Sequence, residues 1–156
     1  MALTTTRIVR DVLTLSATNR ASTVLLDAAL HVLHTKSATF DAIRRVAVAV
    51  GRDRTKHDFN LILRKMFADG VINWGRIVVM FALAIDVQHS RAIDLQLETA
   101  LFVEANLSEW LVAQGGWDVV VPVFDSLLPT TSLAASSPSI AVVIGVTAFV
   151  ATLVTA

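Results

Sequence analysis

The sequence contains no cysteine among its 156 residues, and it has no Lys or Arg after Arg91. Without cysteine the chain cannot form disulfide bonds, use a thiol as a nucleophile or bind a metal through thiolates. The basic residues before Arg91 are scattered among acidic and apolar ones, and the net charge is zero. A nucleic-acid-binding protein would gather its basic residues on one face. We therefore expect no nucleic-acid partner.

Signals for secretion and for β-structure are also missing. The N-terminal residues MALTTTRIVRDV contain no apolar signal-peptide core, so we expect a protein that is not secreted. Residues 119–123 are rich in valine, but this run is short and has no alternating partner with which to form a hairpin. The sequence contains no internal repeat. Its 54% apolar content and its spacing predict one all-α domain with a large core.

Apolar residues with helical spacing predict about eight helices. Ser22 or Thr23 is expected to cap the second, Thr55 or Asp58 to begin the fourth, and Ser90 to cap the sixth. Gly115 and Gly116 break the chain, and Pro122 should kink the last helix or mark its first turn. The first predicted helix is amphipathic, with Arg7, Arg10 and Asp11 on its polar side. Six of the predicted helices cover residues 3–17, 40–50, 73–87, 90–106, 107–113 and 117–128. For the second and the fourth the sequence predicts only where they begin, near residues 22 and 55.

Residues 73–87 carry apolar side chains on every side of a helix. This pattern is typical of a helix that is buried all round. The run is shorter than the about 20 apolar residues needed to cross a bilayer, and Arg76 and Asp86 interrupt it. We expect a central core helix wrapped by the other helices.

The start of this central helix predicts a site for a carboxylate. Asn73 is a strong N-cap residue, which places Arg76 in the first turn, where the helix dipole and unpaired N–H groups already favour negative charge. Gly75 leaves room for another backbone. One hypothesis is that Arg76 binds a carboxylate from elsewhere. The other is that it pairs internally with Asp69 or Asp118, and that Gly75 only serves packing.

The C-terminal part differs in composition from the rest. No charged residue follows Asp125, and a polar stretch at residues 130–139 leads to the apolar residues 140–156. As a helix, these would reach about 26 Å, close to the roughly 27 Å of the thinner intracellular bilayers. We expect a helical domain at residues 1–129, a linker at 130–139 and a membrane anchor at 140–156. The alternative is a tail that packs back onto the domain.

No pattern predicts catalysis. Asp27, His31 and His34 have helical spacing but make a weak metal-binding pattern, which an exposed polar face explains better. His57 and Asp58 adjoin without a nucleophile motif, and the glycine pair does not follow a strand as a phosphate-binding loop would. We expect a protein that is not an enzyme and needs no metal or cofactor.

Two tryptophan-containing motifs carry a resemblance to a known family. Asn73-Trp74-Gly75-Arg76-Ile77-Val78 resembles the first homology motif of the Bcl-2 family, and Phe67-Ala68-Asp69-Gly70-Val71 resembles its lead-in. Trp110 with Gln114-Gly115-Gly116-Trp117-Asp118 resembles the second motif. The resemblance covers nearly the whole chain and is strongest at residues 59–124. It implies a Bcl-2-like bundle of about eight helices around a buried central helix, with a C-terminal hydrophobic tail.

The resemblance also implies a hydrophobic groove that binds amphipathic death-ligand (BH3-type) helices, whose apolar anchors recur at helical spacing. Arg76 would meet the ligand aspartate, Asn73 and Gly75 would border the ligand backbone, and Phe124 would close one end. The groove-lining residues would be Ile62, Met66, Val79 and Leu83. The structural residues of the two motifs would be Trp74, Trp110, Gly115, Gly116, Trp117 and Asp118.

The resemblance implies an apoptosis regulator, and a missing acid favours a pro-survival one. Executioner members carry a ligand motif of their own that ends in Asp, but the two registers available here end in Val48 and Ala38. Expected partners are pro-apoptotic members of the Bax and Bak type, on the cytosolic face of the mitochondrial outer membrane or endoplasmic reticulum, with a cytosolic pool. The short connection TNRAS resembles that of a compact viral homologue. Homodimerisation through the groove stays open.

Two alternatives remain at this point. The first is a pro-apoptotic membrane permeabiliser of the Bax and Bak type, which would have the same fold. The second is a membrane-anchored helical scaffold that binds no ligand.

Overall fold

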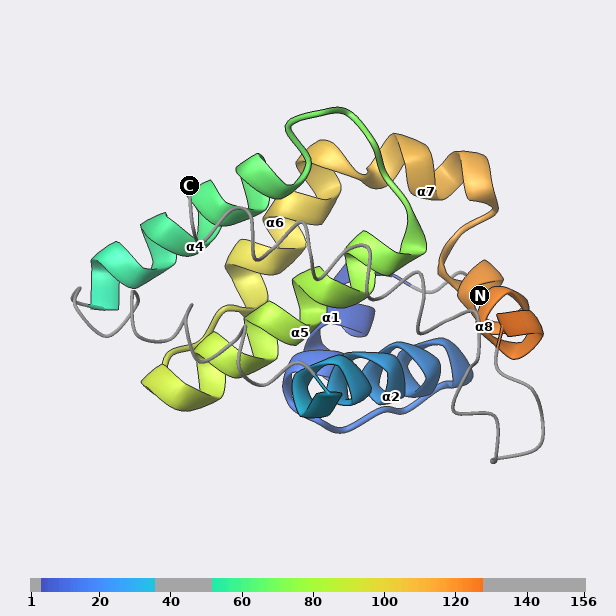
Figure 1. Ribbon diagram of the computed structural model, residues 1–156, viewed down its shortest axis with the longest axis horizontal. Coiled ribbons are helices and arrows are strands. Elements are labelled where there is room, and N and C mark those ends of the chain that lie inside the picture. Colours follow the sequence, from blue (N-terminus) through green and yellow to red (C-terminus); the bar gives the residue numbers. More distant parts are fainter. Residues whose placement is uncertain (1–3, 36–51, 128–156) are drawn as a thin grey trace.

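The computed structural model describes residues 4–35 and 52–127. In these ranges the chain forms seven α-helices and one short 3-10 helix, without a strand, so the predicted all-α class is confirmed. Figure 1 shows their arrangement. The elements are α1 (Thr5–Leu13), α2 (Arg20–Thr35), α4 (Arg52–Met66), α5 (Trp74–Arg91), α6 (Gln96–Asn106), α7 (Ser108–Gln114), η1 (Trp117–Val119) and α8 (Val120–Leu127).

Helix α5 is the central helix, as its sequence predicts. Every residue from 74 to 85 is buried, including Gly75 and Arg76. Helices α1, α2 and α4 all contact α5, and Figure 1 shows it passing through the middle of the bundle. Because α5 is surrounded, any charged group on its first turns must find its partner at the edge of the core.

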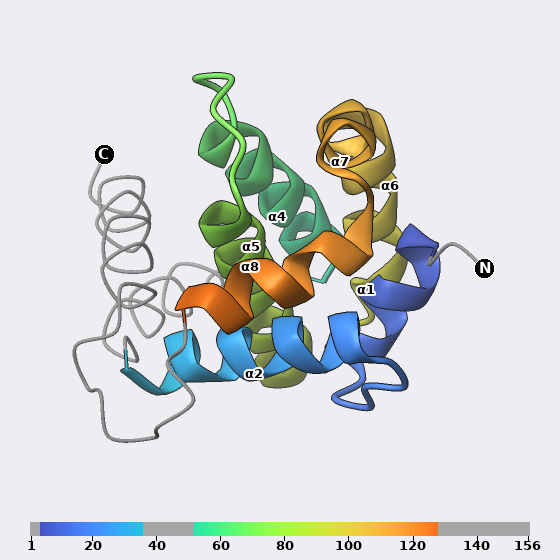
Figure 2. The ribbon, with the colours of Figure 1, turned by 90° about the vertical axis from the view of Figure 1, so that its right-hand side faces the viewer.

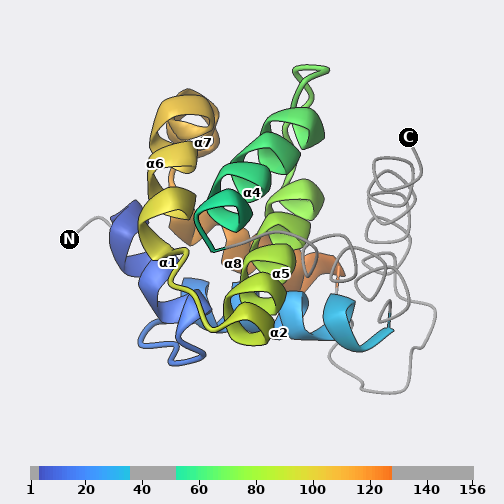
Figure 3. The same cartoon turned by 90° about the vertical axis from the view of Figure 1, so that its left-hand side faces the viewer.

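The other helices cover α5 from different sides. Helix α1 contacts α2 and α6, and α8 contacts α2. Figure 2 shows α8 lying alongside α2, on the side of the bundle that also carries the start of α5. Helix α4 contacts both α5 and α6, and Figure 3 shows it between them. Helix α5 is thus flanked by α4 on one side and by α2 on another, and α8 packs on α2 and η1.

Several helix ends differ from the predicted ones. Helix α1 is shorter than residues 3–17, because Thr14 ends it and Leu15 adopts a left-handed conformation with φ of 57°. Ser22 does not cap α2. Its N–H donates to the Asn19 side chain at 2.8 Å, so Asn19 caps a helix that begins at Arg20.

The fourth and sixth predicted helices begin elsewhere. Helix α4 starts at Arg52, before either predicted residue. Ser90 lies inside α5, which continues until Ala92 adopts a left-handed conformation, and α6 begins at Gln96. A residue of a capping type marks a place where a helix is able to begin. Whether a helix begins there depends on tertiary packing, which here extends α5 past Ser90.

The segment after α7 follows the sequence closely. Gly115 and Gly116 have φ of 107° and 95°, and a side chain at Gly115 would lie 2.9 Å from a Val119 methyl group. Pro122 is in the first turn of α8, where its missing N–H costs no helical hydrogen bond. The valine-rich run at residues 119–123 is helical from Val120 onward, so its exclusion as a strand is confirmed.

The predicted third helix at residues 40–50, the linker at 130–139 and the anchor at 140–156 lie outside the described residues. Among the helices that the structure describes, none is both long enough and apolar enough to cross a membrane.

Candidate ligand site at the start of the central helix

Asn73 caps α5 as predicted. Its side-chain oxygen accepts a hydrogen bond from the Arg76 N–H at 2.8 Å, which satisfies one of the unpaired donors of the first turn. The cap fixes the direction in which the first turn leaves the preceding loop. It thereby places the Arg76 side chain beside the turn that follows α4.

The Arg76 guanidinium is surrounded by oxygen atoms of that turn. Its Nη1 donates to the Asp69 carboxylate at 2.6 Å and to the carbonyls of Met66 and Val71 at 3.0 and 2.8 Å. Its Nη2 donates to the other Asp69 oxygen at 2.8 Å. The sequence left two hypotheses open for Arg76. The structure shows the internal one, in which Arg76 pairs with Asp69. The other proposed partner, Asp118, is exposed on η1.

A tight turn brings Asp69 back to the helix that follows it. Gly70 adopts a left-handed conformation with φ of 76°, which a residue with a side chain would rarely adopt. The Val71 N–H donates to the Asp69 carboxylate at 3.0 Å, closing the turn. The turn therefore presents two carbonyls and one carboxylate toward the same guanidinium.

The two charges of this pair differ in their exposure to water. The Arg76 side chain is 11% exposed, whereas the Asp69 side chain is 46% exposed. The hydrogen bonds from Arg76 and from the Val71 N–H lower the pKa of Asp69 from 3.8 to about 2. The same pairing, acting against burial, raises the pKa of Arg76. The site is thus a cation at the edge of the core, neutralised by an acid at the surface.

The predicted apolar lining is mostly buried. Met66, Val79 and Leu83 are at most 1% exposed, and Phe124 is 5% exposed. Ile62 is half-buried. These side chains come from α4 and α5, which contact each other, and from α8, which packs on α2 and η1. A ligand helix would reach them only after the groups that cover them move, and their ligand contacts stay predictions.

The tryptophans of the two motifs meet at the start of α5. The Trp74 ring lies 5.1 Å from Trp110 and 6.0 Å from Trp117, measured between ring centroids. Trp117 also packs against Phe81 at 6.1 Å. Its indole N–H donates to the Thr5 hydroxyl at 3.2 Å, a contact with α1 that the sequence does not predict. The cluster holds α7 and η1 against the first turn that carries Arg76.

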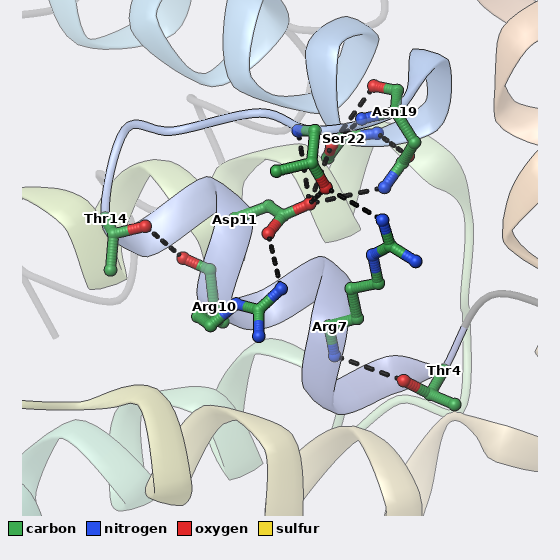
Figure 4. A network of polar contacts seen from close by, with 8 residues as sticks. Thr4, Arg7, Arg10, Asp11, Thr14, Asn19 and Ser22 are labelled. Atoms are coloured by element: carbon green, nitrogen blue, oxygen red, sulfur yellow. Dashed lines mark hydrogen bonds and ion pairs between the residues drawn. The ribbon is translucent and has the colours of Figure 1, made fainter.

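Helix α1 carries a buried acid that its sequence pattern does not predict, shown in Figure 4. Asp11, predicted on the polar side of its helix, has a side chain that is only 2% exposed. Its carboxylate accepts hydrogen bonds from the hydroxyl and N–H of Thr18, the Asn19 amide, the Ser22 hydroxyl and the Arg10 guanidinium. Burial would raise the pKa of Asp11, but the hydrogen bonds outweigh it and lower the pKa below 3.8. Thr18, Asn19 and Ser22 all belong to the polar run TNRAS, which is the sequence signal from which this network could have been predicted.

The residues considered for metal binding lie on the surface. Asp27, His31 and His34 are all exposed on α2. Within residues 4–35 and 52–127, no group of three His, Asp or Glu side chains is arranged to hold a metal ion.

Comparison with known proteins places this geometry in a family. The family model for apoptosis regulator proteins of the Bcl-2 family matches residues 25–117, more than half of the chain. Bcl-2-related protein A1 of Bos taurus is 30% identical over 116 residues, which cover 66% of this chain and 65% of A1. Apoptosis regulator BAX of Homo sapiens is 30% identical over 91 residues, which cover 53% of this chain and 47% of BAX.

The fold is also found in a solved structure. The zebrafish pro-survival protein NRZ, in complex with a Bad BH3 segment, superimposes with a TM-score of 0.64 at 20% sequence identity. The match covers 77% of this chain and 91% of that one. Of the two relatives named above, the matched segment covers about two thirds of the length of A1 and about half of the length of BAX. With both tryptophan motifs at the start of a buried central helix and more than half of its residues matched by the family model, the chain belongs to the Bcl-2 family.

Proposed function

We propose that the protein is a pro-survival regulator that binds BH3-type helices of pro-apoptotic family members between α4, α5 and α8. The observation that carries the proposal is the cation at the start of α5. Arg76 donates to the carbonyl of Met66, the last residue of α4, and its counter-ion Asp69 is half exposed. An amphipathic helix with apolar anchors and one aspartate has the matching chemistry. The pro-survival protein NRZ, which has the same fold, is in complex with a Bad BH3 segment in its own structure.

The apolar anchors are expected to supply most of the affinity. Burying one large apolar side chain contributes about 1.5 to 3 kcal/mol. A hydrogen bond to a charged group nets about the same, 1.5 to 3 kcal/mol. Because a ligand helix carries several anchors and one aspartate, burial dominates the affinity, and Arg76 fixes the register in which the helix binds.

A titration with labelled BH3 peptides, that of Bad included, tests this function. We expect the full-length protein to bind at micromolar concentration or tighter, measured by fluorescence polarisation. Arg76→Ala should weaken binding by about threefold, less than a full charged hydrogen bond, because the internal pair with Asp69 is lost together with the ligand contact, while circular dichroism still shows a folded helical protein. Arg10→Ala is the matched control, since it removes an exposed arginine on α1.

Two results would count against this role. If no peptide binds at micromolar concentration, the ligand-free scaffold becomes the better interpretation. If Arg76→Ala stays folded and binds as the unaltered protein does, then the guanidinium has no part in recognition.

A second candidate function is a membrane permeabiliser of the Bax type. The similarity to BAX at 30% identity over 91 residues favours it. The absence of an acid at positions 38 and 48, where an executioner motif would end, favours the pro-survival role; both positions lie outside the described residues. Expression in cells given a death stimulus separates the two, because a pro-survival protein protects and an executioner kills.

The partners and the location follow from the same proposal. A pro-survival protein of this type would bind Bax- and Bak-like proteins at the mitochondrial outer membrane or the endoplasmic reticulum. Residues 140–156 would anchor it there. Fractionation of cells expressing the protein, with and without this segment, measures the anchoring directly.

A further inference from the structure

The partner of Arg76 suggests how ligand binding is limited. Asp69 uses both of its oxygens on one guanidinium, with contacts of 2.6 and 2.8 Å. This is the two-point geometry by which arginine binds a carboxylate most strongly. We propose that Asp69 is an internal competitor, whose carboxylate a ligand's acidic residue must displace from Arg76. The inference rests on the proposed function and assigns a specificity-determining role to a residue outside the predicted site.

Electrostatics argue against simple sharing of the cation. A second carboxylate at Arg76 would leave one uncompensated negative charge beside a guanidinium that is only 11% exposed. Water screens charges poorly at such a position, so the two carboxylates would repel each other. A ligand aspartate therefore gains most from Arg76 when Asp69 turns away.

Asp69 is placed so that it can leave. Its side chain is 46% exposed and lies on the turn after α4, so the released carboxylate would be hydrated. Arg76 would keep its hydrogen bonds to the carbonyls of Met66 and Val71. The guanidinium is therefore held by backbone groups as well as by the acid, and its position does not depend on Asp69 alone.

Competition has a consequence for selectivity. Binding exchanges one ion pair for another, so the ligand aspartate adds less affinity than it would at a vacant cation. A ligand must then supply the remainder through its apolar anchors. Asp69 thus selects against ligand helices whose apolar anchors bind weakly.

The test compares the full-length protein with its Asp69→Asn variant. Each is titrated with the Bad BH3 peptide and with the same peptide carrying asparagine in place of its motif aspartate. We expect Asp69→Asn to bind the acidic peptide about tenfold tighter, the gain of about one ion pair that no longer has to be broken. The neutral peptide should bind both proteins equally. Asp27→Asn is the matched control, because it removes one exposed acid from α2.

Salt dependence gives a second readout that a purely structural role would not produce. In the unaltered protein the exchange of ion pairs should make affinity nearly independent of salt. In Asp69→Asn the ligand forms a new ion pair, so affinity should fall between about 0.05 and about 0.5 M salt. If Asp69→Asn does not fold, Asp69→Ser serves instead, because a serine hydroxyl is able to accept the Val71 N–H.

The outcomes separate the two proposals. Equal or weaker binding of the acidic peptide by Asp69→Asn would overturn the competitor role and leave the ligand site intact. Binding by Asp69→Asn where the unaltered protein shows none would support the competitor role. Absence of binding by both proteins would overturn the proposed function, and this inference with it.

Discussion

Two arginine-aspartate pairs in the described part of the chain are built in opposite ways. In the α1 pair the acid is hidden and the base is in water, since Asp11 is 2% exposed and Arg10 is 56% exposed. In the α5 pair the base is hidden and the acid is in water, since Arg76 is 11% exposed and Asp69 is 46% exposed. The exposed member of each pair is the one that another group is able to replace.

The difference separates a structural pair from an exchangeable one. Asp11 is held mainly by neutral donors of the α1–α2 connection, so losing Arg10 leaves every hydrogen bond to its Oδ2 in place. Arg76 is held by two carbonyls and by one exposed acid from a surface turn. A partner from another protein has access to the second arrangement but not to the first.

The largest effect is expected at Asp11. Asp11→Asn keeps one acceptor oxygen for the donors that converge on Oδ2, but it removes the negative charge that strengthens these hydrogen bonds and places an NH2 group beside the Arg10 guanidinium. The free energy of unfolding should fall by about 2 to 3 kcal/mol, the range for hydrogen bonds to a buried charge. Urea unfolding measures this, and Asp27→Asn is the surface control. An unchanged midpoint would show that the network contributes nothing to stability.

A smaller, pH-dependent effect is expected at Asp69. Its pKa in the folded protein is about 2, below the ordinary 3.8. Its ionisation therefore favours folding above pH 3.8, and this contribution disappears as the pH falls toward 2. The stability difference between the unaltered protein and Asp69→Asn should be constant near neutrality and shrink in this acid range. A difference that is constant down to pH 2 would mean that the ion pair does not form in solution.

The smallest effect is expected at Arg10. Its guanidinium is more than half exposed, and Asp11 keeps its other hydrogen bonds without it. Arg10→Ala should change the unfolding free energy by no more than about 0.5 kcal/mol, as exposed ion pairs usually do. Thermal unfolding of the variant measures this. A loss as large as that of Asp11→Asn would contradict the contrast between the two pairs.

The sequence predicted the parts of the fold that depend on local chemistry. The Asn73 cap, the glycine break before η1 and the position of Pro122 follow from backbone requirements within a few residues. The central helix followed from its apolar residues on every side. These features need no knowledge of which helices lie next to one another.

Features that depend on tertiary contacts were less predictable. Asp11 lies on the polar side of its helix in the sequence pattern, but the α1–α2 connection covers that side. The partner of Arg76 was left open between Asp69 and Asp118, because the left-handed turn at Gly70 decides which acid reaches the guanidinium. Helical periodicity describes neither the path of a connection nor the direction of a turn.

The hydrogen bond from the Trp117 indole to Thr5 joins segments 112 positions apart. Trp117 also packs against Trp74, the residue that precedes Gly75 and Arg76. Thr5, in the first turn of the N-terminal helix, thus helps to hold the ring that packs against the turn carrying the guanidinium.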